Sequence, residues 1–456
     1  MNVSFQTVRL KFGTFAILVF WYVALYPGRL GFDYAELARM IRRGESTAWW
    51  GATYFWFFKW FTFNTNTIAV ISGIGLLVLV WSLHHFVQNL PLNSIRQRNL
   101  FLILISTPLV GVFGMTVSHD VFQTSGIIFL TSLILKKTQQ QTFQTVDKIS
   151  YACAGVCLTT TQYGILIFIF CSLYFLRIYT RLILFSVSTV LILYFAANAG
   201  ISKEDKSIAH LSNSLPRMLL IDLKCIAQHP QAEITSEEWK VLYRYAPNDL
   251  WKAPVPCSSP DLMAASLNLD SQVLQFDLKL LKAFLNIVSR QPAIPFMSHV
   301  QRSSVALPPP FFQPPPNQIS WDVNQPIGIK TNVALQEGPE LLHPSIDDVQ
   351  LAKRPTFLRP LEMFALLPAF VINQASWFWG WGGFWLWPMI YLFVYRVKTL
   401  TFRQILQIFT PTLTLHSIIF LVGPTSLGRY VMSTILLGFT CLVAVILPRG
   451  NSRSDT

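Results

Sequence analysis

The chain has 456 residues, of which 52% are hydrophobic and only 12% charged, and its formal net charge is +13. This composition excludes an ordinary soluble enzyme, which at this length would form two or three domains with a far more charged surface. Repeated apolar runs of about 15 to 20 residues instead predict an all-α polytopic membrane protein.

The positive charge is unevenly distributed along the chain. Residues 199–360 contain fifteen Lys or Arg and fifteen Asp or Glu, so this region is neutral. The remaining segments contain twenty bases and seven acids, which accounts for the whole net charge. Basic residues in short loops between membrane helices mark the cytoplasmic side. The high charge therefore indicates membrane topology, and we expect no nucleic-acid partner.

The first membrane helix is predicted at 12–26, and the basic residues Arg9 and Lys11 keep its N-terminal end in the cytoplasm. Pro27 and Gly28 end this helix, because proline lacks an amide proton and glycine tolerates the turn. The chain then emerges on the outer side of the membrane.

Asp33, Glu36 and Arg39 recur at helical spacing just after this turn. The spacing predicts a short helix along the membrane surface, with these side chains on one face. Carboxylates held there could activate a hydroxyl or bind a divalent cation such as Mg²⁺ or Mn²⁺, beside a lipid-borne substrate. The alternative is a solvated loop in which Glu36 pairs locally with Arg39.

The aromatic segment 49–63 is interrupted by Lys59 and predicts an in-plane or re-entrant helix rather than a span. His84 and His85, at the end of a later span, are interpreted as interfacial residues without a role in chemistry. The further spans are predicted at 67–86, 100–115, 121–135, 149–162, 164–176, 182–198, 377–395, 405–422 and 430–447. The total is about ten transmembrane helices with both termini in the cytoplasm.

Three polar turns, 115–120, 159–164 and 423–430, lie on the outer side in this topology. Asp120 in the first turn is a candidate functional acid. Withdrawing an ionisable group from water at a membrane boundary costs free energy, so such a group is a functional candidate. Asp120 could equally be the N-cap of the next helix. Arg429 in the last turn suits a phosphate, which its guanidinium can bind with two hydrogen bonds, or it snorkels to lipid headgroups.

Residues 199–360 form a mainly helical extracytoplasmic insertion between a membrane module at 1–198 and C-terminal membrane helices at 361–456. Its proline-rich tract near 307–318 should be extended rather than packed. Cys225 and Cys257 both lie in this insertion, and they could form a disulfide if it faces an oxidising compartment.

Several of these features, taken in order, resemble bacterial GT-C type membrane glycosyltransferases and uncharacterised multi-pass proteins related to them. They are the Tyr-Pro-Gly turn at 26–28 followed by Asp33, the His-Asp turn at 119–120, the insertion before the last spans, and the Arg-Tyr pair at 429–430.

The resemblance implies an inverting, metal-assisted transfer of a sugar from a polyprenyl-phosphate donor to an acceptor outside the bacterial cytoplasmic membrane. Asp33 would match the first-loop catalytic acid and Asp120 the second-loop acid, and both would be candidate metal ligands. Arg429 would match the phosphate-facing arginine. The other residues expected to bind substrate are Glu36, His119, Gln162, Tyr163 and Tyr430.

The sequence also departs from the family pattern. It has Trp50-Gly51-Ala52 where relatives often have His-Pro, and Gln162-Tyr163 where they often have an arginine. These departures favour a non-catalytic binder of lipid-linked saccharides as one alternative. A transporter or flippase of such lipids is the other, although it should carry polar residues in the middle of its spans.

Overall fold

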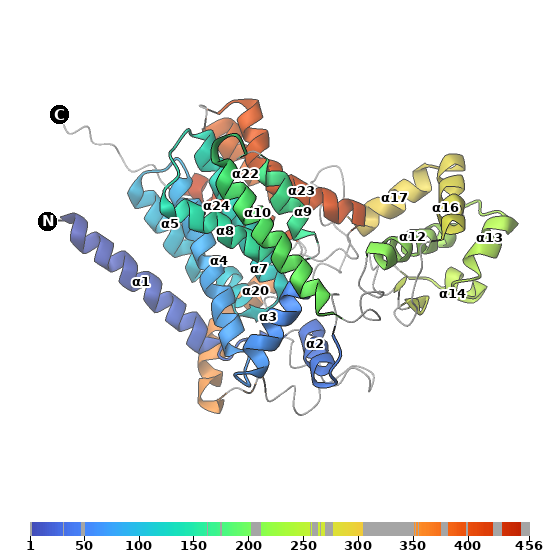
Figure 1. Cartoon of the computed structure of the whole chain (residues 1–456), viewed down its shortest axis with the longest axis horizontal. Coiled ribbons are helices and arrows are strands. Elements are labelled where there is room, and N and C mark those ends of the chain that lie inside the picture. The colour runs from blue at the N-terminus through green and yellow to red at the C-terminus, as the bar shows by residue number, and fades with distance from the viewer. Residues whose placement is uncertain are drawn as a thin grey trace.

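The computed structural model is helical almost throughout the residues it describes (Figure 1). These residues are 2–30, 32–46, 51–161, 163–173, 176–201, 211–255, 257, 263–264, 266–269, 277–303, 351, 353, 355–374, 382–397, 400–422 and 431–447. Within them the strands are β1 (Arg29–Leu30) and β2 (Thr116–Val117), of two residues each. The expected all-helical architecture is therefore present.

The helices fall into three consecutive groups along the chain. The first contains α1 (Asn2–Ala24), α2 (Phe32–Arg42), α3 (Ala52–Phe63), α4 (Ala69–Asn89), α5 (Ser94–Ser106), α6 (Pro108–Gly114), α7 (His119–Thr138), α8 (Thr145–Leu158), α9 (Gly164–Ser172) and α10 (Leu176–Ala199). The second contains α12 (Leu211–Gln228), α13 (Ser236–Leu242), α14 (Asn248–Lys252), α16 (Leu278–Arg290) and α17 (Ala293–Arg302). The third contains η4 (Thr356–Leu358), α20 (Arg359–Gln374), α22 (Leu386–Ile390), η5 (Tyr391–Arg396), α23 (Phe402–Val422) and α24 (Met432–Ile446).

Helix α7 lies at the centre of the bundle, in contact with α4, α8, α23 and α24. Every side chain from Asp120 to Leu135 is buried. Helix α8 approaches closely at Gly126, where an added Cβ would lie 2.7 Å from the Leu158 side chain. Apolar residues occur all round α7 rather than on one stripe, so the helix is stable only in an interior.

The expectation of ten spans is not met by the described residues. Among them, two helices are long and apolar enough to cross a membrane, Ala69–Asn89 and Phe402–Leu421. The pair α5–α6, bent by 58°, would make a third if it acts as one span. Four further apolar helices in the described residues are shorter, and α24, for example, has only 15 residues, whereas a helix needs about 20 residues to cross the hydrocarbon core.

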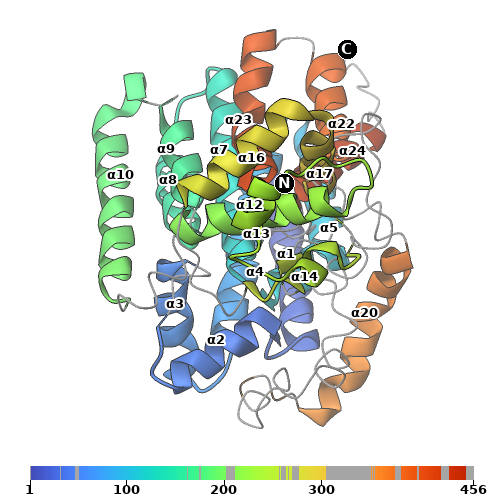
Figure 2. The same cartoon turned by 90° about the vertical axis from the view of Figure 1, so that its right-hand side faces the viewer.

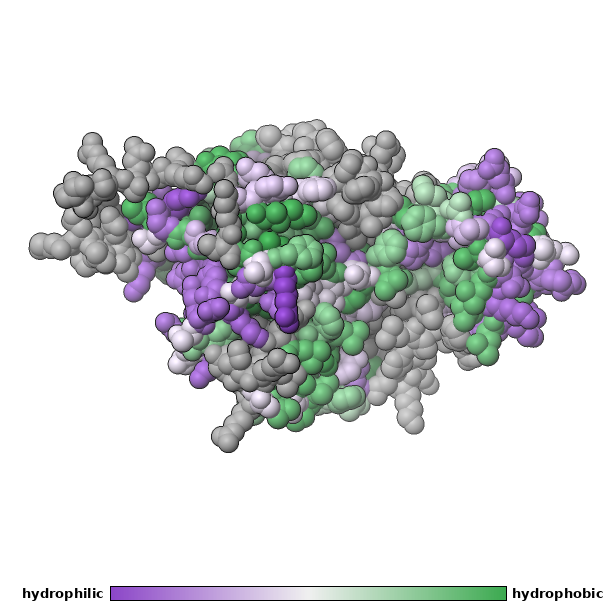
Figure 3. All heavy atoms as spheres, turned by 90° about the horizontal axis from the view of Figure 1, so that it is seen from above, coloured by the Kyte–Doolittle hydropathy of each residue, from purple (hydrophilic) through white to green (hydrophobic). Residues whose placement is uncertain are grey.

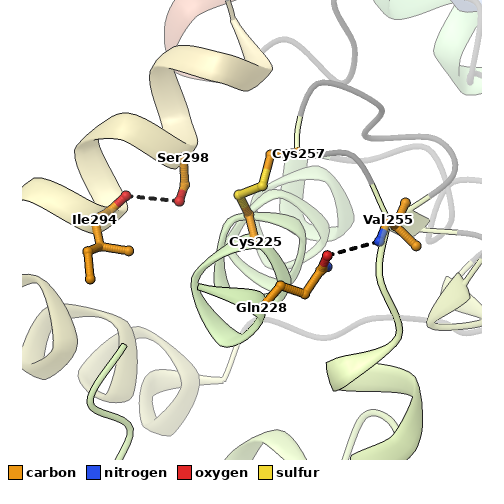
Figure 4. The surroundings of a disulfide bond; sticks show 6 residues. All are labelled: Cys225, Gln228, Val255, Cys257, Ile294 and Ser298. Atoms are coloured by element: carbon orange, nitrogen blue, oxygen red, sulfur yellow. Dashed lines mark hydrogen bonds between the residues drawn. A yellow bond between two sulfur atoms is a disulfide. The ribbon is translucent and has the colours of Figure 1, made fainter. Parts of the chain in front are cut away.

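The α12–α17 domain, formed by the second group of helices, lies beside the bundle (Figures 1 and 2). It has a hydrophobic core of its own, with Trp251 fully buried and its Nε1 donating to the carbonyl oxygens of Leu242 and Ala246. Cys225 on α12 and Cys257 form a disulfide with a Cα–Cα distance of 5.4 Å (Figure 4). The proline-rich tract falls outside the described residues.

The surface of the bundle differs from that of the α12–α17 domain. Figure 3 shows hydrophilic residues gathered at the end of the molecule that contains the α12–α17 domain, and apolar residues together with a second hydrophilic patch over the bundle. Phe12 of α1, Phe185 of α10 and Met363 of α20 are each 72% exposed. Large exposed apolar side chains on several helices are typical of contact with lipid. Helices capable of spanning a membrane and this surface together indicate a membrane-associated protein.

Candidate functional site

The first and second polar loops of the chain are joined by backbone pairing. Strands β1 and β2 lie parallel, with Arg29 opposite Thr116 and Leu30 opposite Val117. The amide of Arg29 also donates to the carbonyl of Met115 at 3.0 Å. Because α2 starts just after β1 and α7 just after β2, this pairing brings the first turns of the two helices together.

Tyr34, in the first turn of α2, makes the side-chain contact between these loops. Its hydroxyl lies 2.6 Å from Nδ1 of His119 and 3.0 Å from Oγ of Ser118, and it accepts from the His119 amide at 3.2 Å. Tyr34 is only 1% exposed. Asp33 is the preceding residue of α2, so its backbone lies at this junction, and its side chain is outside the described set. The same holds for the side chain of Glu36, one turn further along α2.

Asp120 is buried in the first turn of α7, at 1% exposure. Its Oδ2 accepts from the Ser118 hydroxyl at 2.8 Å, and its Oδ1 lies 3.3 Å from Nε2 of His119. With a neutral imidazole that carries its proton on Nε2, Nδ1 accepts from the Tyr34 hydroxyl and Nε2 faces the Asp120 carboxylate. The N-cap of α7 is Ser118, not Asp120 as the sequence allowed. A carboxylate one residue inside the helix is still favoured by the helix dipole.

Tyr54 of α3 completes the group of residues that we call the two-loop cluster: Tyr34, Tyr54, Ser118, His119 and Asp120. Its ring centroid lies 5.6 Å from that of Tyr34 and 5.8 Å from that of His119. Burial raises the pKa of the Tyr54 hydroxyl well above its ordinary value, and the nearby negative charge of Asp120 raises it further. The hydroxyl therefore stays protonated. It has no hydrogen-bond partner among the described residues.

The turn at 159–164 also packs against this region. Gly51, at the N-cap of α3, has φ +91°, and a Cβ there would collide with the Thr160 carbonyl oxygen. The turn is thus held against the start of the helix that carries Tyr54. Tyr163 is partly exposed at the N-cap of α9, whereas Gln162 lies outside the described residues. The turn at 423–430, with Arg429 and Tyr430, lies outside them too.

A second polar cluster, not expected from the sequence, is buried around His85. Nε2 of His85 lies 3.0 Å from Oδ1 of Asp147, and Nζ of Lys136 donates to the other oxygen of Asp147 at 2.8 Å. Nδ1 of His85 lies 2.7 Å from Oγ of Ser132. His85 is therefore a buried partner rather than an interfacial bystander. The signal in the sequence was an isolated acid, Asp147, just inside an apolar run that follows two lysines.

The described side chains include no group of three His, Cys, Asp or Glu residues placed to hold a metal ion. In the two-loop cluster, His119 and Asp120 are the metal-binding residue types, and each oxygen of Asp120 already faces a neighbouring side chain. This set alone does not fit a resident Mg²⁺ or Mn²⁺, which requires several oxygen ligands.

Comparison with known proteins identified no relative. No protein-family model, no curated protein and no solved structure matches this chain.

Proposed function

We propose that the chain is a membrane glycosyltransferase of the GT-C type, which moves a sugar from a polyprenyl-phosphate donor to an extracytoplasmic acceptor. The observation that supports this proposal most directly is the buried Asp120, which accepts a hydrogen bond from Ser118 and lies beside His119. Both of these residues contact Tyr34, in the helix that carries Asp33. Buried acids beside a loop at the membrane surface are candidates for proton transfer to or from a substrate.

In the proposed reaction an acceptor hydroxyl attacks the anomeric carbon of the donor sugar. The new C–O bond forms as the bond to the polyprenyl phosphate breaks, and the phosphate leaves with the electron pair. Asp33 takes the proton of the attacking hydroxyl, and Asp120 holds His119 and Ser118 in place. Arg429 stabilises the departing phosphate by bidentate hydrogen bonds. No step is assigned to a divalent cation, because the described residues do not form a site for one.

The proposal places the protein in a bacterial cytoplasmic membrane with both termini in the cytoplasm and the α12–α17 domain outside. The disulfide between Cys225 and Cys257 supports the outer location of this domain, since disulfides persist in oxidising compartments.

The test is turnover by the purified full-length protein in lipid nanodiscs, with polyprenyl-phosphate pentose and hexose donors, with and without added Mg²⁺. We expect Asp33→Asn to lower turnover by about 10²- to 10⁴-fold, the usual loss for a positioned general base. The matched control is Glu36→Gln, one helical turn away, which should lose far less. Full turnover by Asp33→Asn would show that Asp33 is not the base.

Two observations favour the alternatives. The collision that a Cβ at Gly51 would make with Thr160 leaves no room for a side chain at this position, within the segment 50–52 where the GT-C proteins it resembles often have His-Pro. This supports a non-catalytic binder of lipid-linked saccharides. The buried His85–Asp147–Lys136 cluster is the kind of polar group that a transporter or flippase needs. Binding without turnover, or movement of the lipid between leaflets without turnover, would favour these functions in turn.

A further inference from the structure

The ring of Tyr54 is held rigidly by aromatic neighbours from three helices. Besides Tyr34 of α2 and His119 of α7, it packs on Phe122 of α7 at 6.1 Å and Phe58 of α3 at 6.3 Å between ring centroids. Its exposure is 0%. Aromatic pairs at these distances have preferred orientations, so the direction of the Tyr54 hydroxyl is fixed by packing.

This hydroxyl differs from those of the other fully buried tyrosines. Tyr34 is bonded to Ser118 and His119, and Tyr151 donates to Oγ of Ser172 at 2.5 Å. The Tyr54 hydroxyl has no such partner within the described part of the chain. A buried polar group without a partner is destabilising, and native proteins retain one where water, an ion or a ligand completes the hydrogen bond.

The position of Tyr54 shows what kind of group would complete the bond. Its ring lies against His119, whose neighbour Asp120 is close enough to act on the Tyr54 hydroxyl electrostatically. The phenol is a hydrogen-bond donor, and the negative charge of Asp120 nearby disfavours a second anion as its partner. The partner should therefore be an uncharged group with an acceptor oxygen. A sugar hydroxyl meets both conditions, whereas an alkyl chain has no acceptor and a phosphate is an anion.

We propose that Tyr54 is a substrate-binding residue, and that its hydroxyl donates a hydrogen bond to a sugar hydroxyl of the bound lipid-linked saccharide. This inference rests on the proposed function and identifies the sugar, rather than the phosphate or the lipid, as the part of the substrate bound at the two-loop cluster. The sequence alone does not mark Tyr54 as a candidate, because the residue lies in an aromatic run without any polar motif.

The test compares Tyr54→Phe with the wild type, full length and in nanodiscs. The probes are a polyprenyl-phosphate hexose, a polyprenyl-phosphate pentose and polyprenyl phosphate without a sugar, with affinity measured by native mass spectrometry and melting temperature by circular dichroism. We expect Tyr54→Phe to melt at or above the wild-type temperature without ligand, because it removes an unpaired buried hydroxyl. Its affinity for a sugar-bearing lipid should fall by about 3- to 10-fold, the value of one neutral hydrogen bond, with affinity for the bare lipid unchanged.

The matched control is Tyr151→Phe, which removes a buried hydroxyl that is paired with Ser172. It should melt at a lower temperature and bind all three lipids as the wild type does. Tyr54→Phe with wild-type affinity for every lipid would overturn the inference and show that the hydroxyl meets water only. A lower melting temperature without a sugar-dependent change would show a structural partner and overturn it as well. Equal affinity of the wild-type protein for the sugar-bearing and the bare lipids would instead contradict the proposed function.

Discussion

The Tyr34 hydroxyl lies 2.6 Å from Nδ1 of His119, although 85 positions separate the two residues in the chain. The bond links the first turn of α2, which contains Asp33, to the first turn of α7, which contains Asp120. Two loops that sequence analysis could only assign to the same side of a membrane are therefore in direct contact. The interaction also sets the orientation of the His119 ring, whose other nitrogen faces Asp120.

Tyr34→Phe should destabilise the protein by about 1–3 kcal/mol, because the buried partners on His119 and Ser118 lose a hydrogen-bonding group. The measurement is thermal or denaturant-induced unfolding of the purified protein in mild detergent. Tyr243→Phe is the control. Tyr243 is 45% exposed and stacks on Trp239, so its change should stay within about 0.5 kcal/mol. Equal stability of the two variants would contradict a structural role for the Tyr34 contact.

Lys136→Met should destabilise the protein by about 3–5 kcal/mol, because it leaves the Asp147 carboxylate buried without its ammonium partner. Lys148→Met is the control, since Lys148 is exposed one residue after Asp147. The double variant Lys136→Met with Asp147→Leu should recover part of the loss, because it removes both charges. Losses that simply add in the double variant would show that the two side chains do not interact.

Glu238 predicts a pH dependence of stability in the α12–α17 domain. Burial opposes ionisation of this carboxyl, but hydrogen bonds from the Arg290 guanidinium at 2.8 and 2.6 Å and from Thr235 outweigh it and hold the pKa of Glu238 below its ordinary value. A lowered pKa in the folded state means that the stabilisation is present above the ordinary pKa of about 4.3 and is lost as the pH falls through the lower folded value.

We therefore expect Glu238→Gln to cost about 2 kcal/mol at pH 7 and to flatten the acid side of the stability profile. The measurement is the melting temperature between pH 3 and 7. Glu237→Gln is the matched control, because that side chain is 78% exposed and pairs with Lys240 on the surface. Such exposed pairs contribute about 0–1 kcal/mol. A profile unchanged by Glu238→Gln would show that this ion pair does not contribute to folding.

The proposed topology predicts labelling of engineered cysteines by an impermeant thiol reagent in intact cells. Cysteines placed between 320 and 345 should react, because that segment is proposed to be outside. Cysteines placed between 136 and 148 should react only after the membrane is opened. The parent protein supplies the background, since three of its free cysteines, Cys157, Cys171 and Cys441, are buried and the fourth, Cys153, is partly buried. Labelling of the second set in intact cells would reverse the topology and place Asp33 in the cytoplasm.

The sequence by itself determined the helical, membrane-associated character of the chain. It also determined where the first helix ends, at the turn that contains Pro27 and Gly28. Local composition was sufficient for these, because apolar length and charge position depend on neighbouring residues alone. It also marked Cys225 and Cys257 as the cysteines of the polar insertion, the pair that the structure joins.

The number of membrane spans could not be predicted from the sequence. The break at Pro108 turns one apolar stretch into the bent helices α5 and α6, and hydropathy does not record such a bend. Helix α7 likewise takes its buried position from the helices around it. Its amino-acid pattern only shows that it could occupy such a place.

The partners of the candidate site were decided by the tertiary structure alone. Tyr34 and Tyr54 are ordinary aromatic residues in the sequence, and His85 reads as one of two histidines at the end of an apolar run. Their roles depend on contacts with residues 47 to 85 positions away, such as Ser132 for His85 and His119 for Tyr34. Long-range pairing of this kind leaves no periodic signal, because it is set by how the helices pack rather than by which residues follow one another.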